Sequence, residues 1–548
     1  MPIQLTIQST HGSKTQTLAV TEGEKRVLTD VLAANGIQLN TRCGKRGACR
    51  GCMVELVRGS VNGPLGLIEA PAEIRTCQAR LLPIGDVAVR IPAHARLEAK
   101  PQVGDSFVIN TAVALEPLWP VSDGKLDTAF AVDVGTTTVV VAIIDLAKGE
   151  VLARAGDFNA QIRFGDNVIT RIVAAATPLA REQMRLAMLQ ETIAPLLAKA
   201  CRDAGRDPTR LAGGILAGNT TMLHLLTGED PAGLGVVPFT PKFIESRTMT
   251  AAELGLARVS TNAALRNDVP MVLLPGFSAY VGADLVAGIY ATGMMNDEKP
   301  SLLVDIGTNG EIVLQADGKL YCCATAAGPA FEGSGLLAGT RAQLGAISHL
   351  KLAGGEQFGF ELETIGGGDP LSAPGLCGTA YVDFLATARR AGLLLPSGRF
   401  NPKEWQRLPV DLRTKTPGGF TLKIAGNLCI NEADIASLIQ AKAAIGAGIE
   451  ILLRAAHLRA ADIGTLYLAG GFGLYIDVEH AIDIGLLPGF MREQVKVMGN
   501  TSLGGATLAA LDRCALPEMI AWRKSAQIFE LNAQPGFEDC YLDHLSLP

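Results

Sequence analysis

A hairpin motif occurs twice in this chain and constrains the fold of most of its length. Residues 132–143 read VDVGTTTVVVAI, and residues 304–315 read VDIGTNGEIVLQ. Each copy is an apolar strand, an Asp-Val-Gly-Thr or Asp-Ile-Gly-Thr turn, and a second apolar strand. One Asp-Gly hairpin is common in purely structural roles, whereas two copies in one chain indicate a duplicated architecture.

The residue types in these turns suit the binding of phosphate. An aspartate at a strand end can hold Mg²⁺ or its waters, and glycine lets the backbone approach phosphate oxygens. Threonine hydroxyls and the N–H groups of the turn donate hydrogen bonds to the same oxygens. The motif therefore predicts a site for the phosphates of a nucleotide.

A third glycine-rich turn ends a strand at residues 466–473, LYLAGGFG. A Gly-Gly turn lets a flat purine lie against the backbone, although an ordinary strand-to-helix turn is the alternative. In this order, DVGTTT, DIGTNG and AGGFG resemble the two phosphate hairpins and the adenosine motif of the acetate and sugar kinase/Hsp70/actin superfamily. The resemblance implies a duplicated, ribonuclease-H-like α/β fold whose two halves close on ATP.

The same resemblance implies a role for each turn. We expect Asp133 and Asp305, as catalytic carboxylates, to hold Mg²⁺ or position water. Glu311 is a further acidic candidate for water activation, although an outward-facing strand residue is the preferred interpretation. Gly470 and Gly471 are expected to flank adenosine. The residues expected to line the phosphates are Gly135, Thr136, Thr137, Gly307, Thr308 and Asn309.

Two Gly-Asn-Thr turns, GNTT at 218–221 and GNTS at 499–502, each follow an apolar strand and open a predicted helix. Asn and Thr cap helix N-termini, where N–H groups could also receive an anion. Capping alone explains both turns, so a functional role is left open. Their parallel placement favours the duplicated architecture in either case.

Four of the eleven cysteines lie in the first 77 residues, with the spacing C-x5-C-x2-C-x24-C. Three close thiolates with a distant fourth match a [2Fe–2S] ferredoxin loop, whose last ligand comes from a later strand. Structural zinc is the alternative, but zinc sites usually pair their ligands as two C-x2-4-C knuckles. The predicted cluster ligands are Cys43, Cys49, Cys52 and Cys77.

This N-terminal stretch resembles the plant and adrenodoxin class of [2Fe–2S] ferredoxins, which implies a β-grasp fold. The domain organisation expected from the whole sequence has four parts. They are a ferredoxin-like domain at 1–92, a linker at 93–126, a first ribonuclease-H-like (middle) domain at 127–206 and an ATP-binding C-terminal domain at 207–548. The linker carries three prolines, and either a tether or a packed connector fits its composition.

The composition restricts the partners. The net charge is −6, which gives no electrostatic footprint for nucleic acid or an anionic membrane surface. No uninterrupted apolar run reaches the ~18 residues of a membrane span, and the N-terminus lacks the pattern of an export signal. We therefore expect a cytoplasmic protein without membrane or nucleic-acid partners.

A ferredoxin domain ahead of this ATP-binding body resembles the reductive activators of corrinoid-dependent methyltransferases. Segments along the whole chain carry the resemblance, among them RFGDNVITRI at 163–172, TAAGPAFEG at 325–333 and YLAGGFGLYID at 467–477. It implies ATP-dependent transfer of one electron from the cluster to the inactive Co(II) corrinoid of a partner protein, which regenerates Co(I). It also implies a low-potential electron donor upstream and a homodimer.

The corrinoid itself is expected on the partner, because this chain lacks the D-x-H-x-x-G pattern of corrinoid-binding proteins. The nearest stretch, DVEHAIDIG at 477–485, has the wrong spacing, and His480 is predicted to be an ordinary helix residue.

Three other functions remain open at this point. The first is a small-molecule kinase with an iron–sulfur sensor, although no substrate motif is apparent. The second is an activator of 2-hydroxyacyl-CoA dehydratases, for which Cys322 and Cys323 would have to ligate a shared [4Fe–4S] cluster; adjacent strand residues point to opposite faces, which favours core packing. The third is a chaperone-like ATP switch that needs no electron transfer.

Overall fold

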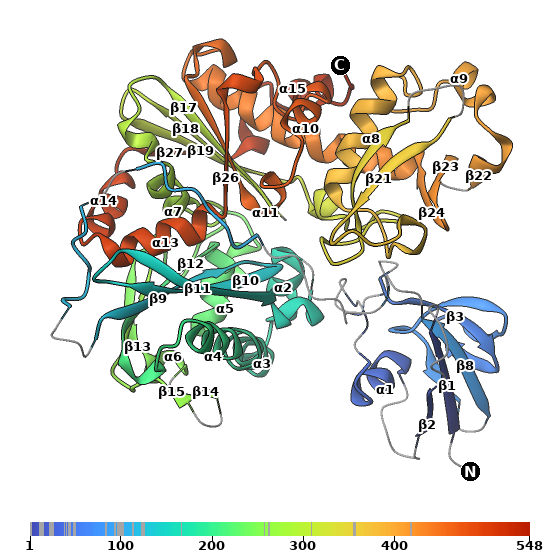
Figure 1. Cartoon of the computed structure of the whole chain (residues 1–548), viewed down its shortest axis with the longest axis horizontal. Coiled ribbons are helices and arrows are strands. Elements are labelled where there is room, and N and C mark those ends of the chain that lie inside the picture. The colour runs from blue at the N-terminus through green and yellow to red at the C-terminus, as the bar shows by residue number, and fades with distance from the viewer. Residues whose placement is uncertain are drawn as a thin grey trace. The chain divides into compact units, whose positions relative to one another are not determined.

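The computed structural model describes most of the chain as two compact units, residues 1–100 with 161–166 and residues 101–160 with 167–548 (Figure 1). The residues it does not describe are 1–2, 10–15, 21–26, 38, 40, 42–44, 46, 48–50, 83–84, 92–94, 96–103, 112–113, 122–125, 166, 257, 261–262, 308, 354–357 and 417–418.

The first unit contains a five-stranded sheet in the order β2-β1-β8-β3-β6. β1 and β8 pair in parallel, and the other neighbours are antiparallel. Helix α1 (Leu28–Ala34) contributes Leu28, Val31 and Leu32 to the core that the sheet also lines. This arrangement is the β-grasp fold predicted for the N-terminal domain. The strands are β1 Ile3–Ser9, β2 Gln16–Val20, β3 Met53–Arg58, β6 Ala72–Arg75 and β8 Asp86–Ile91, with a second small sheet of β4 Ser60–Gly63, β5 Gly66–Glu69 and β7 Arg80–Leu81.

The second unit begins with a six-stranded sheet in the order β11-β10-β9-β12-β16-β13. β9, β10 and β11 form an antiparallel meander, and β12 and β16 run parallel to β9. The sheet continues past residue 206, where the first half was expected to end, because β12 and β16 come later in the chain. The strands are β9 Thr128–Val134, β10 Thr138–Asp145, β11 Glu150–Phe158, β12 Leu211–Gly218, β13 Arg247–Thr250 and β16 Pro270–Leu273.

The other large sheet repeats this topology in the order β26-β25-β17-β18-β19-β27. β17, β18 and β19 form the antiparallel meander, and β25 and β26 run parallel to β17. The two hairpin motifs therefore occupy the same place in two ribonuclease-H-like halves, and the duplicated fold is confirmed. The strands are β17 Ser301–Ile306, β18 Gly310–Ala316, β19 Lys319–Thr325, β25 Thr465–Ala469, β26 Val495–Gly499 and β27 Ala526–Phe529.

The helix that follows β16 and the helix that follows β26 cross closely in the middle of the unit. These are α7 (Ala283–Thr292) and α13 (Thr501–Leu511). A Cβ atom added to Gly505 would lie 1.9 Å from the carbonyl oxygen of Ala287, so the close backbone approach requires glycine there. Other helices are α2 Val168–Ala174, α3 Pro178–Met188, α4 Ala194–Asp203, α5 Thr220–Thr227, α6 Ala251–Leu254, α9 Pro402–Arg407, α14 Ala515–Trp522 and α15 Phe537–Asp543.

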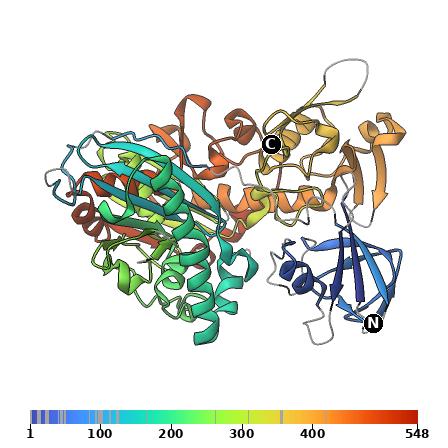
Figure 2. The same ribbon diagram turned by 60° about the horizontal axis from the view of Figure 1, so that its bottom comes forward.

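An insertion of the second half lies between β19 and the helix α10, and Figure 2 shows its strands and helix beside one another. Helix α8 packs on the hairpin β20–β21, and three further strands form a small sheet. The elements are β20 Ile347–Leu352, β21 Phe360–Thr364, α8 Gly378–Arg390, β22 Arg413–Thr416, β23 Gly419–Ala425 and β24 Leu428–Asn431.

The longest described helix is α10 (Glu432–Ala455). By length and composition alone it could cross a membrane, but 78% of its most apolar 18-residue window is buried within the fold. It therefore has the character of a core helix. Helices α3 and α4 are joined by one π-helical turn at Leu189–Ile193.

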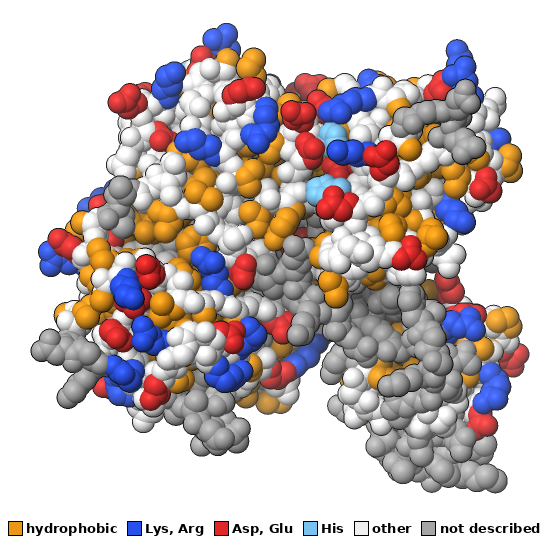
Figure 3. Space-filling view, viewed as in Figure 1, with side chains coloured by type: hydrophobic (Ala, Val, Ile, Leu, Met, Phe, Trp, Pro, Cys, Tyr) orange, Lys and Arg blue, Asp and Glu red, His pale blue; other side chains and the backbone are white. Residues whose placement is uncertain are grey.

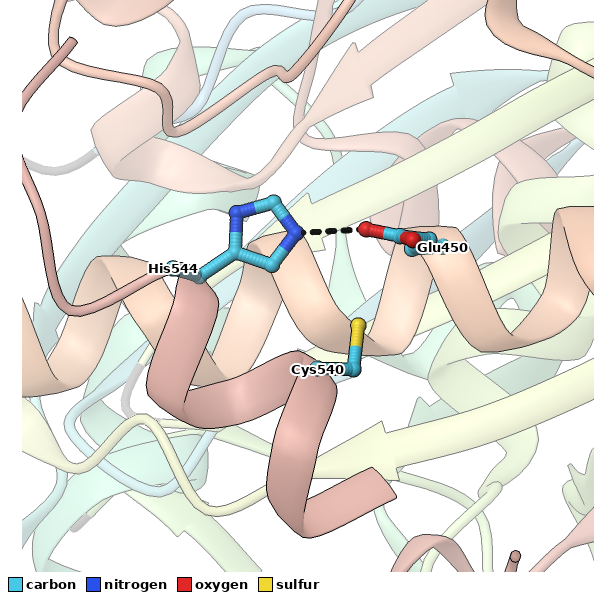
Figure 4. Close-up of side chains that lie close together, drawn as sticks. All are labelled: Glu450, Cys540 and His544. Atoms are coloured by element: carbon cyan, nitrogen blue, oxygen red, sulfur yellow. Dashed lines mark hydrogen bonds and ion pairs between the residues drawn. The ribbon is translucent and has the colours of Figure 1, made fainter. Parts of the chain in front are cut away.

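The last described helix, α15, is attached to α10 by polar contacts (Figure 4). His544 Nε2 lies 2.9 Å from Glu450 Oε2, and the buried Cys540 side chain points toward the same carboxylate. A Cβ atom added to Gly446 would lie 3.0 Å from His544 Nδ1, so the imidazole rests where α10 has no side chain. These contacts fix the end of the chain to the core of the second half.

The described part of the predicted linker is a packed segment. We call residues 104–111 and 114–121 the connector. Their backbone donates hydrogen bonds to α7, β26 and α13: Val108 N to Met498 O at 2.9 Å, Asn110 N to Ala291 O at 3.1 Å, and Leu118 N to Ala510 O at 3.0 Å. Of the two interpretations of this stretch, the structure supports the packed one for these residues.

On the face shown in Figure 3, acidic and basic side chains are interspersed, and neither sign gathers into a large patch.

Candidate nucleotide site and cluster ligands

A cavity of about 490 Å³ in the second unit is lined by both hairpin motifs and by the turn after β25. All of the ATP-site residues predicted from sequence that the structure describes reach it, and Thr308 lies outside the described residues. Their assignment to phosphate, Mg²⁺ and adenosine stays a prediction. The predicted residues in the lining are Asp133, Gly135, Thr136, Thr137, Asp305, Gly307, Asn309, Gly470 and Gly471.

Asp133, at the end of β9, is held by the turn that opens α13. Asn500 Nδ2 donates to its Oδ2 at 2.8 Å, and Ser502 Oγ donates to its Oδ1 at 2.8 Å. Asn500 Oδ1 also accepts the N–H of Leu503 at 2.8 Å and so caps the helix. Burial raises the pKa of Asp133, and the two hydrogen bonds oppose that rise.

In the other Gly-Asn-Thr turn, the side-chain amide of Asn219 likewise makes one capping contact and one contact with a hairpin motif. Asn219 Oδ1 accepts the N–H of Met222 at 2.9 Å and caps α5, while its Nδ2 donates to Thr136 Oγ1 at 2.9 Å. Capping is therefore only half of what each asparagine does, because both amides also reach the first hairpin motif.

The two asparagine turns are not repeats of one another, contrary to the parallel placement expected from sequence. GNTT follows β12, whose counterpart in the second half is β25, whereas GNTS follows β26, the counterpart of β16. The topological partner of GNTT is the AGGFG turn. The two turns share Gly-Asn-Thr because Asn and Thr are preferred at the N-terminus of any helix that follows a strand, so the shared residues do not indicate equivalent positions.

Six carboxylates line the cavity, and four of them influence one another's pKa as a group: Asp133, Asp284, Asp305 and Glu311. Burial, followed by the charge of Asp284, raises the pKa of Asp305 to about 7. Burial is also the main cause that raises the pKa of Asp284 to about 7. The pKa of Glu311 is raised well above its usual range by burial and by Asp284 and Asp305. Such a group needs a cation to remain ionised, and carboxylates beside phosphates are the ligands that Mg²⁺ uses.

The sequence interpretation misplaced Glu311 and did not identify Asp284. The interpretation of Glu311 as an outward-facing strand residue is wrong, because it pairs directly across the hairpin with Asp305 and lines the cavity. Residues opposite one another in an antiparallel pair share a face, so the register of the hairpin carried this signal. Asp284 stands in the first turn of α7, and no local pattern marks it.

The raised pKa values predict a pH-dependent stability. The pKa of Asp284 is about 7 in the folded protein, against about 4 in the unfolded chain. Below pH 4 the carboxyl is neutral in both states, so its burial does not destabilise the fold. As the pH rises from 4 to 7, the unfolded state is increasingly favoured because only there does the carboxyl ionise easily. In metal-free buffer, Asp284→Asn should raise the free energy of unfolding at pH 8, on the order of 2 kcal/mol after solvent screening, and have a much smaller effect at pH 5. Thermal unfolding measured at both pH values checks this, and an effect independent of pH would contradict it.

The two glycines of the AGGFG turn have different surroundings. Gly470 has φ +89°, and a Cβ atom there would lie 2.4 Å from the carbonyl oxygen of Ile306 and 2.7 Å from Asp305 Oδ1. A Cβ atom on Gly471 would meet no atom within 4 Å. Gly470 is therefore required by the backbone, whereas Gly471 leaves open space in the cavity wall.

This difference predicts opposite effects of two alanine substitutions. Gly470→Ala should destabilise the second unit by about 2 kcal/mol or more, because the left-handed conformation and the contact with Ile306 both disfavour a side chain. Gly471→Ala should leave stability within about 0.5 kcal/mol but weaken nucleotide binding about tenfold. Thermal unfolding and calorimetric titration with ATP measure the two effects, and equal behaviour of the two variants would contradict the assignment.

Two of the four predicted cluster ligands are described, and both are buried in the first unit. Cys52 directly precedes β3 and Cys77 follows β6. The N–H and the hydroxyl of Thr76 each donate to the carbonyl oxygen of Cys52 at 3.1 Å, which joins the two segments. The pKa of Cys52 is lowered to about 6, chiefly by a hydrogen bond from Cys77. Cys43 and Cys49 lie outside the described residues.

Lys45 and Gly47 pack closely against Gln78, the residue that follows Cys77. Gly47 has φ +74°, and a Cβ atom there would lie 2.9 Å from Cγ of Gln78. The Gln78 amide donates to the carbonyl oxygen of Lys45 at 2.7 Å. The described residues thus fit a thiolate-held cluster, because Lys45 and Gly47 lie against the segment that carries Cys77.

Other residues that could have served a metal are accounted for by packing. Cys322 and Cys323 on β19 are fully buried, and burial raises the pKa of the Cys323 thiol well above its usual range. His480 lies in helix α12 (Val478–Asp483), as predicted, with Nδ1 2.7 Å from Asp383 Oδ1. Asp383 also accepts from His349 Nδ1 at 2.9 Å.

Comparison with known families divides the chain into three matched regions. Residues 9–82 match the 2Fe-2S iron-sulfur cluster binding domain, residues 128–297 match the RACo middle region, and residues 299–548 match the C-terminal domain of RACo, the ASKHA domain. The last two regions coincide with the two duplicated halves.

Individual relatives cover most of the chain. A corrinoid activation enzyme, RamQ, of Eubacterium limosum is 31% identical over 427 residues, which are 75% of this chain and 69% of that protein. A [Co(II) methylated amine-specific corrinoid protein] reductase of Methanosarcina barkeri is 26% identical over 442 residues, 76% of each chain. The solved structure of a reductive activator for a corrinoid, iron-sulfur protein has a TM-score of 0.70 and 29% identity, covering 99% of this chain and 98% of that one.

Proposed function

Since the chain belongs to the family of reductive activators of corrinoid proteins, we propose that it passes one electron from a [2Fe–2S] cluster to the Co(II) corrinoid of a partner protein, restoring Co(I), at the expense of ATP. The observation that carries this proposal is the presence, in one chain, of a ferredoxin-type unit with buried Cys52 and Cys77 and of a duplicated unit with a carboxylate-lined cavity. Neither unit alone would suffice for the reaction.

The energetic problem explains why the two units are joined. Plant-type clusters have reduction potentials near roughly −400 mV, and the Co(II)/Co(I) couple of most corrinoid proteins lies lower. Each ~59 mV of a one-electron gap lowers the equilibrium constant tenfold. ATP can close the gap only if the complex has two states that differ in their interaction with the nucleotide.

In this chain the grouped carboxylates Asp133, Asp284, Asp305 and Glu311 would hold Mg²⁺, and the turns of the two hairpin motifs would bind the phosphates. The bound cation would screen the charge that builds up when Asp284, Asp305 and Glu311 ionise together. The AGGFG turn would place adenosine against the backbone of Gly471. This distribution puts ligand groups on both duplicated halves, so a bound nucleotide would favour the state in which the halves are together.

The proposal extends to the surroundings of the reaction. A low-potential donor must re-reduce the cluster after each transfer, and the corrinoid protein must bring its cobalt to the cluster unit. We further propose that the protein is cytoplasmic, as expected from its sequence, and that it forms a homodimer, as the resemblance to the activator family implies.

The decisive experiment combines the full chain with a corrinoid protein in the Co(II) state and a strong reductant. Formation of Co(I), followed by its visible absorbance, should require the cluster, Mg²⁺ and ATP together. Cobalt reduction that is independent of ATP would overturn the coupling. Robust phosphorylation of a sugar or short carboxylic acid, with no cobalt reduction, would instead favour a kinase.

A further inference from the structure

The turn GPAFEG at 328–333 lies against the cavity but belongs to neither hairpin motif nor to the AGGFG turn. Its one-turn 3-10 helix, Pro329–Glu332, is enclosed by Gly328 (φ +71°) and Gly333 (φ +72°). A Cβ atom on Gly333 would lie 2.4 Å from the carbonyl oxygen of Thr340, so the local backbone requires glycine.

The turn is also fixed from its other side. The N-terminal residue of α8, Gly378, approaches it so closely that a Cβ atom there would lie 1.6 Å from the carbonyl oxygen of Phe331. The rings of Phe331 and Phe472 stack with their centroids 5.2 Å apart, and Phe472 follows the two glycines of the adenosine turn. The backbone that carries Glu332 is therefore held in place by α8 and by α11 (Gly470–Gly473).

Glu332 reaches from the second half to the first. Its side chain is half-buried and lines the cavity. Oε2 accepts a hydrogen bond from Thr137 Oγ1 at 3.0 Å, and Thr137 belongs to the first hairpin motif. A carboxylate of one half thus lies beside the phosphate-binding turn of the other half.

This position differs from that of the other cavity carboxylates. Asp133, Asp284, Asp305 and Glu311 form one group, because the charges of Asp133, Asp284 and Asp305 raise the pKa of their neighbours. Both oxygens of Asp133 are further engaged by Asn500 and Ser502. Those four suit a cation, whereas Glu332 contacts a threonine hydroxyl of the kind that binds a terminal phosphate.

We propose that Glu332 positions the attacking water and accepts its proton when ATP is hydrolysed at this site. The inference rests on the proposed function, since it requires that ATP occupies the cavity. The water oxygen forms a bond to the γ-phosphorus, and the bond from that phosphorus to the β–γ bridging oxygen breaks. ADP leaves with the electron pair of the broken bond, and one water proton passes to the carboxylate.

The arrangement ties hydrolysis to contact between the two halves. The carboxylate comes from β19–α8 of the second half, and the phosphate turn comes from β9–β10 of the first. If the halves separate, Glu332 leaves the phosphate turn and the water loses its base. Hydrolysis therefore occurs only in the state in which the nucleotide is enclosed by both halves.

Two substitutions in the full chain test the proposal. Glu332→Gln keeps an oxygen that accepts the Thr137 hydrogen bond but cannot take a proton, whereas Glu332→Ala removes both functions. We expect Glu332→Gln to lower the turnover of ATP at saturation by about 100-fold or more, with the ATP dissociation constant within about threefold of the unchanged protein. Glu361→Gln, an exposed position on β21 outside the cavity lining, is the control and should hydrolyse ATP normally.

The outcomes separate the alternatives. If Glu332→Gln turns over ATP like the unchanged protein while Glu332→Ala is impaired, Glu332 is only a contact between the halves, and the proposal is wrong. Loss of ATP binding in Glu332→Gln would make it a binding residue and would equally overturn the proposal. If the unchanged chain itself neither binds nor hydrolyses ATP, the proposed function fails instead. Retained ATP binding shows that the variant is folded.

Discussion

Serine in place of Cys52 is expected to abolish corrinoid reduction, by at least about 100-fold, while ATP hydrolysis stays within about twofold of the unchanged protein. Cys52 is fully buried beside Cys77 in the core of the first unit, so a hydroxyl there cannot replace a thiolate without disturbing the ligand set. The cavity lies wholly in the second unit, which has its own core. Iron content, the electron paramagnetic resonance of the reduced cluster and Co(I) formation measure the effect.

The matched control is Cys201→Ser, which replaces a buried cysteine of α4 in the second unit and should retain both iron and cobalt reduction. Cobalt reduction by the Cys52 variant would show that electrons do not pass through the N-terminal cluster. A full-strength [4Fe–4S] signal in that variant would point to a cluster elsewhere, as in the activators of 2-hydroxyacyl-CoA dehydratases.

Asparagine in place of Asp305 should reduce ATP hydrolysis by about 100-fold or more and weaken its dependence on Mg²⁺. Asp305 ends β17, faces Glu311 across the hairpin and lies at the centre of the carboxylate group. The amide has almost the same size but no charge for the cation. Because burial already disfavours the ionised form of Asp305, the variant should be no less stable than the unchanged protein in metal-free buffer at pH 8.

Asp317→Asn provides the control, since Asp317 is exposed in the turn between β18 and β19 of the same meander. Its φ of +50° is a conformation that asparagine also accepts. Hydrolysis should be measured over a range of Mg²⁺ concentrations for both variants. Normal hydrolysis by Asp305→Asn would remove this carboxylate from the cation site.

Local pattern was sufficient for the parts of the site that are continuous in sequence. Each hairpin motif contains both of its strands and the turn between them, so these elements could be predicted directly. The second copy of the motif predicted that the two halves share one topology. The ferredoxin unit could be predicted for the same reason, because the spacing of its cysteines is set by one loop and one later strand.

The rest of the site depends on residues that meet only after folding. Asp284 and Asn500 come from the turns after the fifth strands of the two halves, and sequence alone does not indicate which turns converge. Glu332 stands in a short turn whose role depends on its contact with Thr137 in the other half. Glu311 is the exception, since the hairpin register alone places it on the same face as Asp305.

The side-chain amide of Asn500 connects the cavity residue Asp133 to the start of the connector. Its nitrogen donates both to Asp133 at 2.8 Å and to the carbonyl oxygen of Gly104 at 3.2 Å, at the start of the connector. Gly104 is also packed against Gly471, since a Cβ atom there would lie 3.0 Å from the Gly471 Cα. Two hydrogen bonds of Asn500 and one packing contact thus connect Asp133, Gly104 and the AGGFG turn. A shift of the Asp133 side chain would therefore reach the start of the connector at Gly104 through a single amide group.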